Sequence, residues 1–430
     1  MRTTADGTAV PQADITAADL HASSLYGTGD PHPIWTAMRR HSPVHRQELP
    51  DGREFWSVTK YDDVNDVLRD HTRFTSKRGT LLSILGGRDP AGGKMMAASD
   101  PPAHTAMRRP MADLLSARAL SPLVPKVRRM VDRMLAPLAD GTWNLARALA
   151  DFPMAFTGTL MGLPESDWPR LTRLTSTAIA PDDPEFSQGD GTLASAHHEL
   201  FSYFSADVRR RAGDPGDDLV GSLLRMDVGG RPFRHDELVY NCYSLLLGAN
   251  VTTPHAVAGT VLALIEHPDE YRRLLADPEL VPSAVEEGLR WSSPANHFMR
   301  HVTRPTEIRG VELRRGDPVV AWLGSANRDE EVFADPFRFD VSRSPNRHVA
   351  FGFGPHYCIG APLARIALRL LVDRIVGTVA EFRLEAPVEH LTSNFVAGIK
   401  DMRVSARLHR GAAEKLEEAI TLDEPVPLNG

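Results

Sequence analysis

The sequence predicts a single, mainly α-helical domain that also contains a few short strands. Helical patterns dominate residues 125–212, and a second long helical stretch covers 236–266. The strand-like segments are short, and the first two, within residues 44–58, are joined by a Pro-Asp-Gly turn that is typical of a hairpin. Neither a Gly/Ser-rich linker nor a repeat divides the 430 residues. One large domain is therefore favoured over the roughly three that length alone would suggest.

The composition is that of a soluble globular protein, with 42% hydrophobic and 24% charged residues. A net charge of -7 and a pI near 6.2 argue against a nucleic-acid partner, which calls for a basic surplus. Two cysteines, Cys242 and Cys358, exclude a disulfide scaffold and fit a reducing compartment. Residues 1–20 lack the apolar segment of a signal peptide, and polar residues interrupt the apolar run at 245–265. We therefore expect a cytoplasmic protein without a membrane anchor.

The first hundred residues are predicted to form short elements followed by a long loop that could bind a ligand. The elements expected there are, in order, a flexible segment at 1–20, a helix at 34–40, the hairpin at 44–58 and a helix at 61–70. A glycine-rich loop follows from 80 to 99, and loops of this length are often functional. Met95 and Met96 at its end place flexible thioethers where a substrate could bind, although methionine more often fills gaps in a core.

Two cationic side chains then share one face of a helix that begins after Pro101 and Pro102. His104 and Arg108 are four residues apart, so they are neighbours on the helix surface. Two donors on one face suit an anionic group such as a carboxylate. On these residues alone, a solvated basic face is the simpler interpretation.

The long helix at 236–266, roughly 45 Å at 1.5 Å per residue, is unusual in its middle. The small residues Gly248 and Ala249 leave a shallow groove there. Pro254 has no N–H with which to bond the carbonyl of Asn250. That free carbonyl and the Thr252 hydroxyl are predicted to lie about half a turn apart, where a water could be inserted and the helix could kink.

The most informative stretch is 351–361, in which three glycines and a proline surround Cys358 just before a helical run. Glycine lets the backbone adopt unusual conformations and approach a bound group closely. The exposed N–H groups and the positive end of the following helix favour a thiolate, the form in which cysteine binds a soft metal ion. We therefore interpret Cys358 as a metal ligand. The alternative is a glycine-rich turn around an inert, buried cysteine.

This stretch resembles the signature Phe-Gly-x-Gly-x-His-x-Cys-x-Gly of the cytochrome P450 haem-thiolate monooxygenases. Its fixed positions are filled here by Phe351, Gly352, Gly354, His356, Cys358 and Gly360. The resemblance implies the mainly α cytochrome P450 fold, with a large helical lobe around the haem and a smaller β-rich lobe. It implies one catalytic domain at 21–410, between the flexible segment at 1–20 and a C-terminal tail at 411–430.

The implied cofactor is haem b, iron protoporphyrin IX, with Cys358 as the axial iron ligand and Phe351 packed against its sulfur. By the same resemblance, the haem propionates would be bound by His104, Arg108, Arg300 and His356, and the remaining loop contacts would come from Gly352 and Gly360.

A Glu-x-x-Arg motif places Glu287 and Arg290 for contact on one helical face. Exposed pairs at this spacing are common and weak. Its position before the cysteine loop, however, matches the buried ion pair of the P450 family. In that family a further arginine completes the network, and Arg338 is expected to fill this role.

The interrupted helix resembles the oxygen-activating groove of the family, with Thr252 as its alcohol and Ala249 in its floor. Val251 stands where the family has an acid. In relatives the acid and the alcohol together deliver the protons for O–O bond cleavage. We expect that protons here arrive through a water chain held at the Asn250 carbonyl, or with the help of a polar substrate. Radical coupling, ring formation or nitration, which depend less on protons, are the alternative.

The resemblance also places the substrate against the distal helix and two turns. The expected contacts, with the two methionines, are Leu247, Asn296, His297, Phe395 and Val396. His297 could be read as a catalytic base, but a histidine of the pocket wall or of the core is the simpler interpretation.

The implied activity is the insertion of one oxygen atom from O2 into a small organic molecule, by hydroxylation or epoxidation, as in the tailoring of secondary metabolites. Ferredoxin and ferredoxin reductase, with NAD(P)H as the ultimate donor, are the expected partners, docking near Arg109, Arg347 and Arg369. Neither a nucleic acid nor a membrane is expected as a partner. A non-catalytic haem-binding protein and a cysteine hydrolase are the rivals, but no third group orients His356 as a base for the latter.

Overall fold

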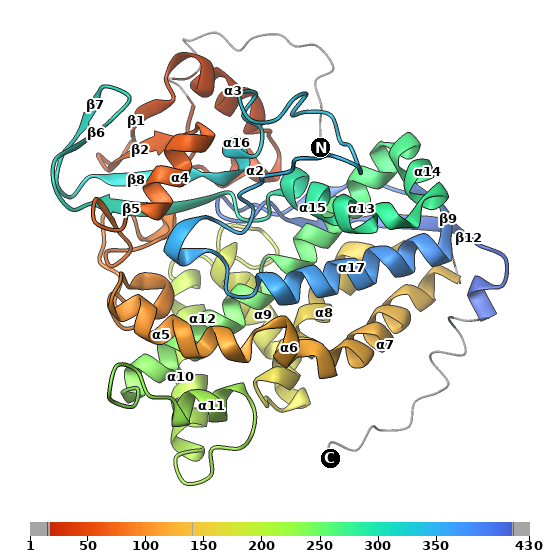
Figure 1. The fold of residues 1–430 in the computed structure, drawn as a ribbon, viewed down its shortest axis with the longest axis horizontal. Helices are drawn as coiled ribbons and strands as arrows, with labels where there is room; N and C mark the ends of the chain where they lie inside the picture. The colour runs from red at the N-terminus through yellow and green to blue at the C-terminus, as the bar shows by residue number, and fades with distance from the viewer. Residues whose placement is uncertain (1–14, 16–17, 140, 415, 417–430) are drawn as a thin grey trace.

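The computed structural model describes residues 15, 18–139, 141–414 and 416 (Figure 1). The predicted flexible segment at 1–20 and tail at 411–430 therefore lie largely outside the described residues. Where the structure does describe them, Ile15, Leu20 and Leu416 are buried in hydrophobic clusters.

The smaller lobe is built on a five-stranded sheet in the order β1-β2-β8-β5-β3, at the upper left of Figure 1. Its strands are β1 (Val44–Glu48), β2 (Glu54–Val58), β3 (Phe74–Thr75), β5 (His297–Val302) and β8 (Pro318–Trp322). β1 and β2 form the predicted antiparallel hairpin, whereas β2 and β8 run parallel, with Trp56 opposite Val319. The other neighbours in the sheet are antiparallel.

Short helices and a second hairpin surround this sheet. They are α2 (Ser24–Gly27), α3 (His32–His41), α4 (Tyr61–Arg69), α16 (Leu323–Ala326), β6 (Thr306–Ile308) and β7 (Val311–Leu313). α3 and α4 confirm the helices predicted at 34–40 and 61–70. The predicted loop at 80–99 contains two single turns of 3-10 helix, η1 (Leu82–Ile84) and η2 (Met96–Ala98).

The larger lobe is helical, which confirms the predicted fold class. Its helices are α5 (Ala103–Leu114), α6 (Ala117–Leu120), α7 (Val124–Leu135), α8 (Leu145–Leu160), α9 (Trp168–Ile179), α10 (Thr192–Arg210), α11 (Leu219–Arg225), α12 (His235–Asn250), α13 (Thr253–Glu266), α14 (Pro268–Ala276), α15 (Val281–Ser292) and α17 (Ala361–Thr378). Two small sheets complete it: β4 (Trp143–Asn144), β9 (Val379–Leu384) and β12 (Arg403–Leu408), and the pair β10 (Glu389–His390) and β11 (Ile399–Asp401).

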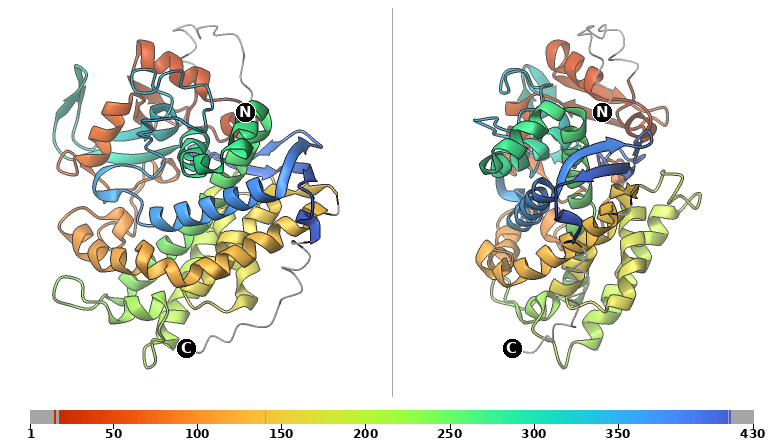
Figure 2. Two further views of the ribbon diagram at one scale, coloured as in Figure 1. Left: turned by 45° about the vertical axis from the view of Figure 1, so that its right-hand side comes forward. Right: turned by 90° about the vertical axis from the view of Figure 1, so that its right-hand side faces the viewer.

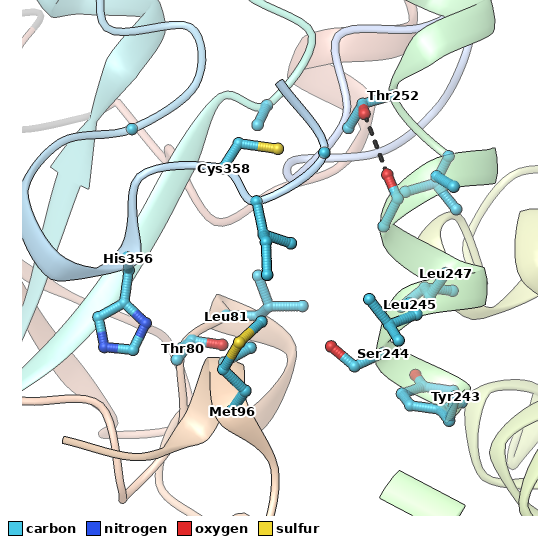
Figure 3. Close-up of a pocket in the computed structure, with 18 of the residues that line it drawn as sticks. Thr80, Leu81, Met96, Tyr243, Ser244, Leu245, Leu247, Thr252, His356 and Cys358 are labelled. Carbon is cyan, nitrogen blue, oxygen red and sulfur yellow. Dashed lines mark hydrogen bonds between the residues drawn. The ribbon is translucent and has the colours of Figure 1, made fainter. Parts of the chain in front are cut away.

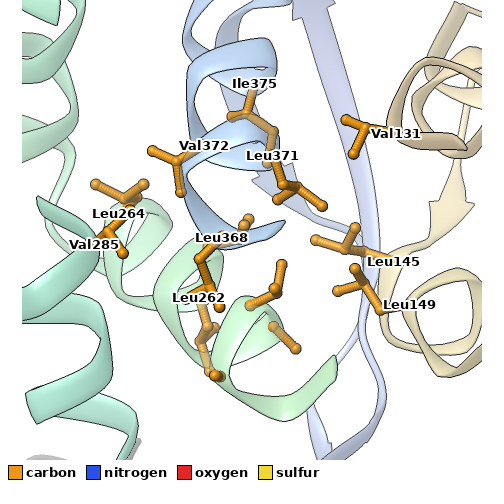
Figure 4. Close-up of a cluster of buried hydrophobic side chains, with 14 of the residues drawn as sticks. Val131, Leu145, Leu149, Leu262, Leu264, Val285, Leu368, Leu371, Val372 and Ile375 are labelled. Atoms are coloured by element: carbon orange, nitrogen blue, oxygen red, sulfur yellow. The ribbon is translucent and has the colours of Figure 1, made fainter. Parts of the chain in front are cut away.

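The main core lies where α17 packs against α7, α13 and α15, and α7 and α17 run side by side in Figures 1 and 2. On α17, Leu368, Leu371, Val372 and Ile375 follow the i, i+3, i+4, i+7 spacing that places side chains on one helical face. All four are buried, and Figure 4 shows them directed at apolar side chains of the neighbouring helices. This packing holds the first turn of α17, and therefore the preceding cysteine loop, in a fixed position.

The predicted long helix at 236–266 is two helices, α12 and α13, separated at Val251 and Thr252. The break lies where the missing N–H of Pro254 predicts it. The first helix begins at His235, because the Glu237 carboxylate accepts a hydrogen bond from the Arg234 N–H at 2.8 Å and so caps its first turn.

Among the described residues, the stretch His235–Glu266 is the one that is long and apolar enough to cross a membrane by length and composition. Within the apolar window, 56% is buried inside the protein, and the break interrupts the helix. These properties identify it as a core helix of the larger lobe.

Candidate active site

A cavity of about 700 Å³ lies between the broken helix and the cysteine loop. Its walls come from α12, α13, α10, α5, the loop before η2 and the first turns of α17. Figure 3 shows Cys358 facing this space from one side, with Thr252 on the other. Of the predicted site residues, the following line the cavity: Met95, Met96, His104, Arg108, Leu247, Ala249, Thr252, Arg300, Phe351, Gly352, His356, Cys358, Gly360 and Phe395.

The loop that presents Cys358 depends on glycine at two positions. Gly352 and Gly354 both have φ of +71°, in the left-handed region that disfavours other residues. A Cβ on Gly354 would also lie 2.7 Å from the Cα of Arg69, so the loop packs closely on α4. The Cys358 N–H donates to the Phe351 carbonyl at 2.8 Å, which closes the loop and directs the sulfur into the cavity.

The electrostatic environment of the Cys358 sulfur has two opposing parts. Burial raises the pKa of the thiol, while the N–H groups of Gly360 and Ala361 and the charges of Arg108 and Arg365 lower it. The predicted effect of the helix N-terminus therefore has the right sign, but burial outweighs it in the protein alone. A bound metal ion would supply the remaining stabilisation of the thiolate.

Four donor side chains gather at this end of the cavity: His104, Arg108, Arg300 and His356. The rings of His104 and His356 lie 4.3 Å apart between centroids, and Arg108 donates to the Tyr357 carbonyl at 2.6 Å. Burial, followed by neighbouring charges, lowers the pKa of His104 to about 4 and that of His356 to about 2. Both ring nitrogens of His104 are buried without a hydrogen-bond partner.

Arg300 adds a fully buried cation to this group. Its guanidinium donates to the Met299 carbonyl at 2.9 Å, and burial lowers its pKa to about 10. The charge of Asp100 raises the pKa of Arg300 and so partly opposes the effect of burial. The Asp100 carboxylate, however, already accepts hydrogen bonds from Thr75 and Ser76. The buried Arg300 cation and the His104 ring without hydrogen-bond partners are unfavourable unless an anionic ligand lies beside them.

These residues fit haem b. Its iron needs one soft ligand, which Cys358 offers, and its two propionates need the buried donors just described. The rest of the cavity is mostly apolar, as a porphyrin face requires. Among the described residues, no group of three or more His, Cys, Asp and Glu side chains could hold a metal ion.

The opposite wall carries the break in the distal helix. The Thr252 hydroxyl donates to the Gly248 carbonyl at 3.4 Å, a long hydrogen bond that Figure 3 marks. A Cβ on Gly248 would meet no atom within 4 Å outside the backbone of its own helix. Gly248 therefore leaves open space in the wall that faces Cys358, as predicted. Val251 is buried at 4% exposure and lines both this cavity and a second, smaller one.

Asn250 faces away from the large cavity. Its side-chain amide donates to the Leu246 carbonyl at 2.8 Å, and its Oδ1 is buried without a partner. Asn250 and His255 line the second cavity, of about 80 Å³, on the far side of the helix. The predicted contribution of Asn250 therefore falls to its main-chain carbonyl, which Pro254 leaves without an N–H donor.

Three predicted substrate contacts do not line the cavity: Asn296, His297 and Val396. His297 is fully buried, where its ring accepts from the Leu82 N–H at 3.2 Å and packs 5.1 Å from the Trp322 ring. It supports the wall from behind, as the structural interpretation of this histidine expected. Besides Arg300, the residues that line the cavity from these two turns are Pro294, Ala295, Phe298 and Phe395.

The wall of the cavity far from Cys358 contains none of the residues predicted from the sequence. That wall contains Asp89 on the loop, His197 and Phe201 on α10, and Tyr240 and Tyr243 on α12. The spacings of four and three residues along each helix place these side chains on common faces. Such spacing is equally typical of a core face, so the sequence offered no way to recognise a cavity wall.

The predicted ion pair is buried, but its third member differs. Arg290 donates two hydrogen bonds of 2.7 Å to Glu287, and both side chains are fully buried. The further arginine is Arg343, whose guanidinium lies 3.1 Å from Glu287. Arg338 is wrong in this role, because its side chain is exposed and its main-chain carbonyl accepts from Arg343 at 2.8 Å. Arg343 also donates to the Asp335 carbonyl at 3.2 Å, at a turn where Asp335 has φ of +46°.

A second network, absent from the predictions, connects α15 to the cysteine loop. Arg365 donates two hydrogen bonds of 2.8 Å to Glu286 and one of 2.8 Å to the Tyr357 hydroxyl. Its guanidinium also lies over the Phe351 ring, 4.5 Å from the centroid. Burial alone would raise the pKa of Glu286, but Arg365 and His348 lower it to about 2.

Comparison with known proteins agrees with this geometry. The family model described as Cytochrome P450 matches residues 190–395. The chain is 33% identical to "Cytochrome P450 monooxygenase PikC" of Streptomyces venezuelae, over 96% of this chain and 100% of the relative. It is 34% identical to "Cyclomarin C epoxidase CymV" of Salinispora arenicola, over 90% of this chain and 99% of the relative.

A solved structure matches the fold over almost its full length. The crystal structure of P450 OxyD, described as involved in the biosynthesis of vancomycin-type antibiotics, superposes with a TM-score of 0.81 at 34% sequence identity. The match covers 91% of this chain and 100% of that one. Both the helical lobe and the strand-rich lobe are therefore shared.

Proposed function

This chain belongs to the cytochrome P450 family of monooxygenases, and from that premise we propose that it uses haem b and O2 to hydroxylate or epoxidise a small, largely apolar molecule. The observation that carries this proposal is the cavity itself, in which a cysteine thiol faces the Thr252 break across an apolar space. The relatives named as a monooxygenase and an epoxidase, and the structure linked to antibiotic biosynthesis, favour a role in tailoring secondary metabolites.

Haem bound through a cysteine thiolate supplies the activation of O2 and the insertion of its oxygen atom. The chain positions that group and excludes water from it. His104, Arg108, Arg300 and His356 would hold the propionates, which would give the buried Arg300 charge a counter-ion and the His104 ring a hydrogen-bond partner. Phe351 closes the cysteine side and, under the Arg365 guanidinium, shields the sulfur from solvent.

Protons are delivered from the Thr252 side. Val251 cannot carry a proton, so the Thr252 hydroxyl and water at the Asn250 carbonyl must do so together. The long hydrogen bond from Thr252 to Gly248 leaves that hydroxyl free to turn toward the cavity. The buried, unpaired Asn250 Oδ1 marks the second cavity behind the helix as polar enough to hold the water that supplies this route.

Electrons come from a separate protein, and a ferredoxin with its NAD(P)H-dependent reductase is the proposed donor. Arg109, Arg347 and Arg369 are exposed, as a docking surface for an acidic partner requires. Cys242 and Cys358 are both free cysteines, which fits the reducing environment of the cytoplasm, our proposed location.

The test begins with the spectrum of the purified holoprotein. Reduced protein under CO should show the red-shifted Soret band of thiolate ligation, and NADPH with a ferredoxin system and O2 should then convert a bound substrate to its oxygenated product. If the protein shows this Soret band but converts none of the small molecules that bind to it, it is a non-catalytic haem-binding protein. Coupled or nitrated products in place of oxygenated ones would identify the alternative chemistry that Val251 suggests.

A further inference from the structure

The end of the cavity far from Cys358 is an aromatic pocket. Phe201 lies 4.7 Å from Tyr243 and 5.2 Å from Tyr240 between ring centroids, and His197 lies 5.7 Å from Tyr243. Tyr243 is 8% exposed and lines the cavity. Figure 3 shows it at the opposite end of the drawn site from Cys358.

The Tyr243 hydroxyl is available to a ligand. It has no hydrogen-bond partner among the residues that the structure describes, although a buried phenol normally has one. Tyr243 precedes Thr252 by nine residues along the distal helix, which corresponds to about 14 Å at 1.5 Å per residue. A molecule that reaches from the oxidation site to this hydroxyl must therefore be elongated.

The charge at this end is negative and unpaired. Of the described residues that line the cavity, Asp89 is the one acid, and the arginines of the cavity wall are both at the cysteine end. Asp89 Oδ1 accepts from the Ala91 N–H at 2.9 Å, but no cationic side chain of the described chain pairs with this carboxylate. Burial raises the pKa of Asp89, as expected for a carboxylate that lacks a counter-charge.

The neighbouring basic groups do not neutralise Asp89. The Lys94 ammonium lies 5.7 Å from the Tyr240 ring, yet it pairs with Asp236 at 3.1 Å. Burial lowers the pKa of His197, so this histidine is neutral at physiological pH. Asp89 is nevertheless close enough to Tyr243 that its charge adds to burial in raising the pKa of the phenol.

We propose that Asp89, Tyr243, Tyr240 and Phe201 form a subsite for a cationic nitrogen, carried as an amine at one end of an elongated apolar substrate whose other end is oxidised near Thr252. A carboxylate beside aromatic faces is the combination that binds a protonated or quaternary amine. The subsite deepens the proposed monooxygenase function and rests on it.

The experiment uses the holoprotein and three ligands that share a decyl chain: decyltrimethylammonium, 1-decanol and decanoate. The quaternary nitrogen has no lone pair and cannot bind the iron directly, so its measured affinity reports binding in the cavity alone. Affinities are measured by isothermal titration calorimetry, which requires no turnover. We expect decyltrimethylammonium to bind at least about tenfold more tightly than 1-decanol, and decanoate to bind most weakly.

Variants then assign the preference to the subsite. Asp89→Asn should abolish the tenfold preference for the cation and leave the affinity for 1-decanol unchanged. Tyr243→Phe should weaken 1-decanol by a smaller factor, because its hydroxyl can bond to the phenol, and should leave the affinity for decyltrimethylammonium nearly unchanged, because a quaternary nitrogen makes no hydrogen bond. Asp217→Asn is the matched control, because its carboxylate is exposed outside the cavity and its loss should leave the preference intact.

Equal affinities for decyltrimethylammonium and 1-decanol, or a preference that survives Asp89→Asn, would overturn the subsite. These results leave the CO spectrum of the same preparation untouched. A missing thiolate band would instead reject the proposed function, so the two failures are separable.

Discussion

The two ends of the cavity are built by opposite means. At the Cys358 end, charged side chains are bound to one another, as in the fully buried pair of Glu287 with Arg290 and the partly buried pair of Glu286 with Arg365. At the far end, Asp89 and the Tyr243 hydroxyl line the cavity without such partners among the described residues. At the first end, the polar side chains are paired within the protein except where the cofactor binds. At the second end, polar groups without protein partners remain free to bind a ligand.

This difference separates positioning from recognition. Buried, fully bonded networks cost much to disturb, so they keep a metal ligand in one position. Unpartnered polar groups in an apolar wall gain most from a ligand that satisfies them. Substitutions at the first end should therefore damage the protein or its cofactor, and those at the second should change only what it binds.

The largest effect is expected at the metal ligand. Cys358→Ser should abolish the thiolate spectrum under CO and reduce turnover by more than about a hundredfold. Mutating even a residue that only hydrogen-bonds to a metal ligand typically lowers metal affinity or activity by about 10–100-fold. Absorption spectroscopy and product formation measure both. Cys242→Ser is the control, since this buried thiol does not line the cavity and burial raises its pKa to about 12. An unchanged spectrum in Cys358→Ser would contradict the assignment of the axial ligand.

Breaking the buried ion pair should have the next largest effect. Glu287→Ala leaves the Arg290 charge buried without its partner and should lower the free energy of unfolding by about 3–5 kcal/mol. Arg343→Ala should destabilise the protein as well. Arg338→Ala should change stability by less than about 0.5 kcal/mol, since only its main chain contributes. Urea denaturation measures the stability of the three variants. Equal losses of stability in Arg338→Ala and Arg343→Ala would show that the Arg338 side chain also belongs to the buried network.

Thr252→Ala should uncouple electron consumption from product formation. Because general acid–base groups contribute about 10²–10⁴-fold, we expect product per NADPH to fall at least about tenfold while NADPH oxidation continues. Thr252→Ser keeps the hydroxyl and should restore coupling. Product per NADPH that is unchanged in Thr252→Ala would show that this hydroxyl does not handle the proton.

The smallest effect concerns the pH dependence of stability. Arg365 and His348 hold the pKa of Glu286 at about 2, below its ordinary value of 4.5. This carboxylate therefore stabilises the fold at neutral pH, and its contribution is lost as pH falls from 4.5 toward 2. Because the pair is partly exposed, the difference from Glu286→Gln should be about 1 kcal/mol or less. Urea midpoints of both proteins should converge on acidification; a constant gap would argue against the pair.

The cysteine loop could be predicted because its chemistry is local. A short run of glycines, with His356 and Cys358 at set intervals before a helix, dictates both the backbone conformation and the direction of the sulfur. The break in the distal helix is local for the same reason, since Pro254 removes one defined hydrogen bond. The paired spacing of Glu287 and Arg290 also follows from helix geometry alone.

The tertiary structure decided which residues meet across the chain. Arg343 rather than Arg338 joins the buried network, because the path of the loop brings the Arg343 guanidinium to 3.1 Å from Glu287. His297 lies behind the wall and His197 lies in it, although neither sequence position shows this difference. Which side chains face a cavity depends on contacts between segments far apart in sequence, and the periodicity of one helix cannot distinguish a cavity wall from a packed core.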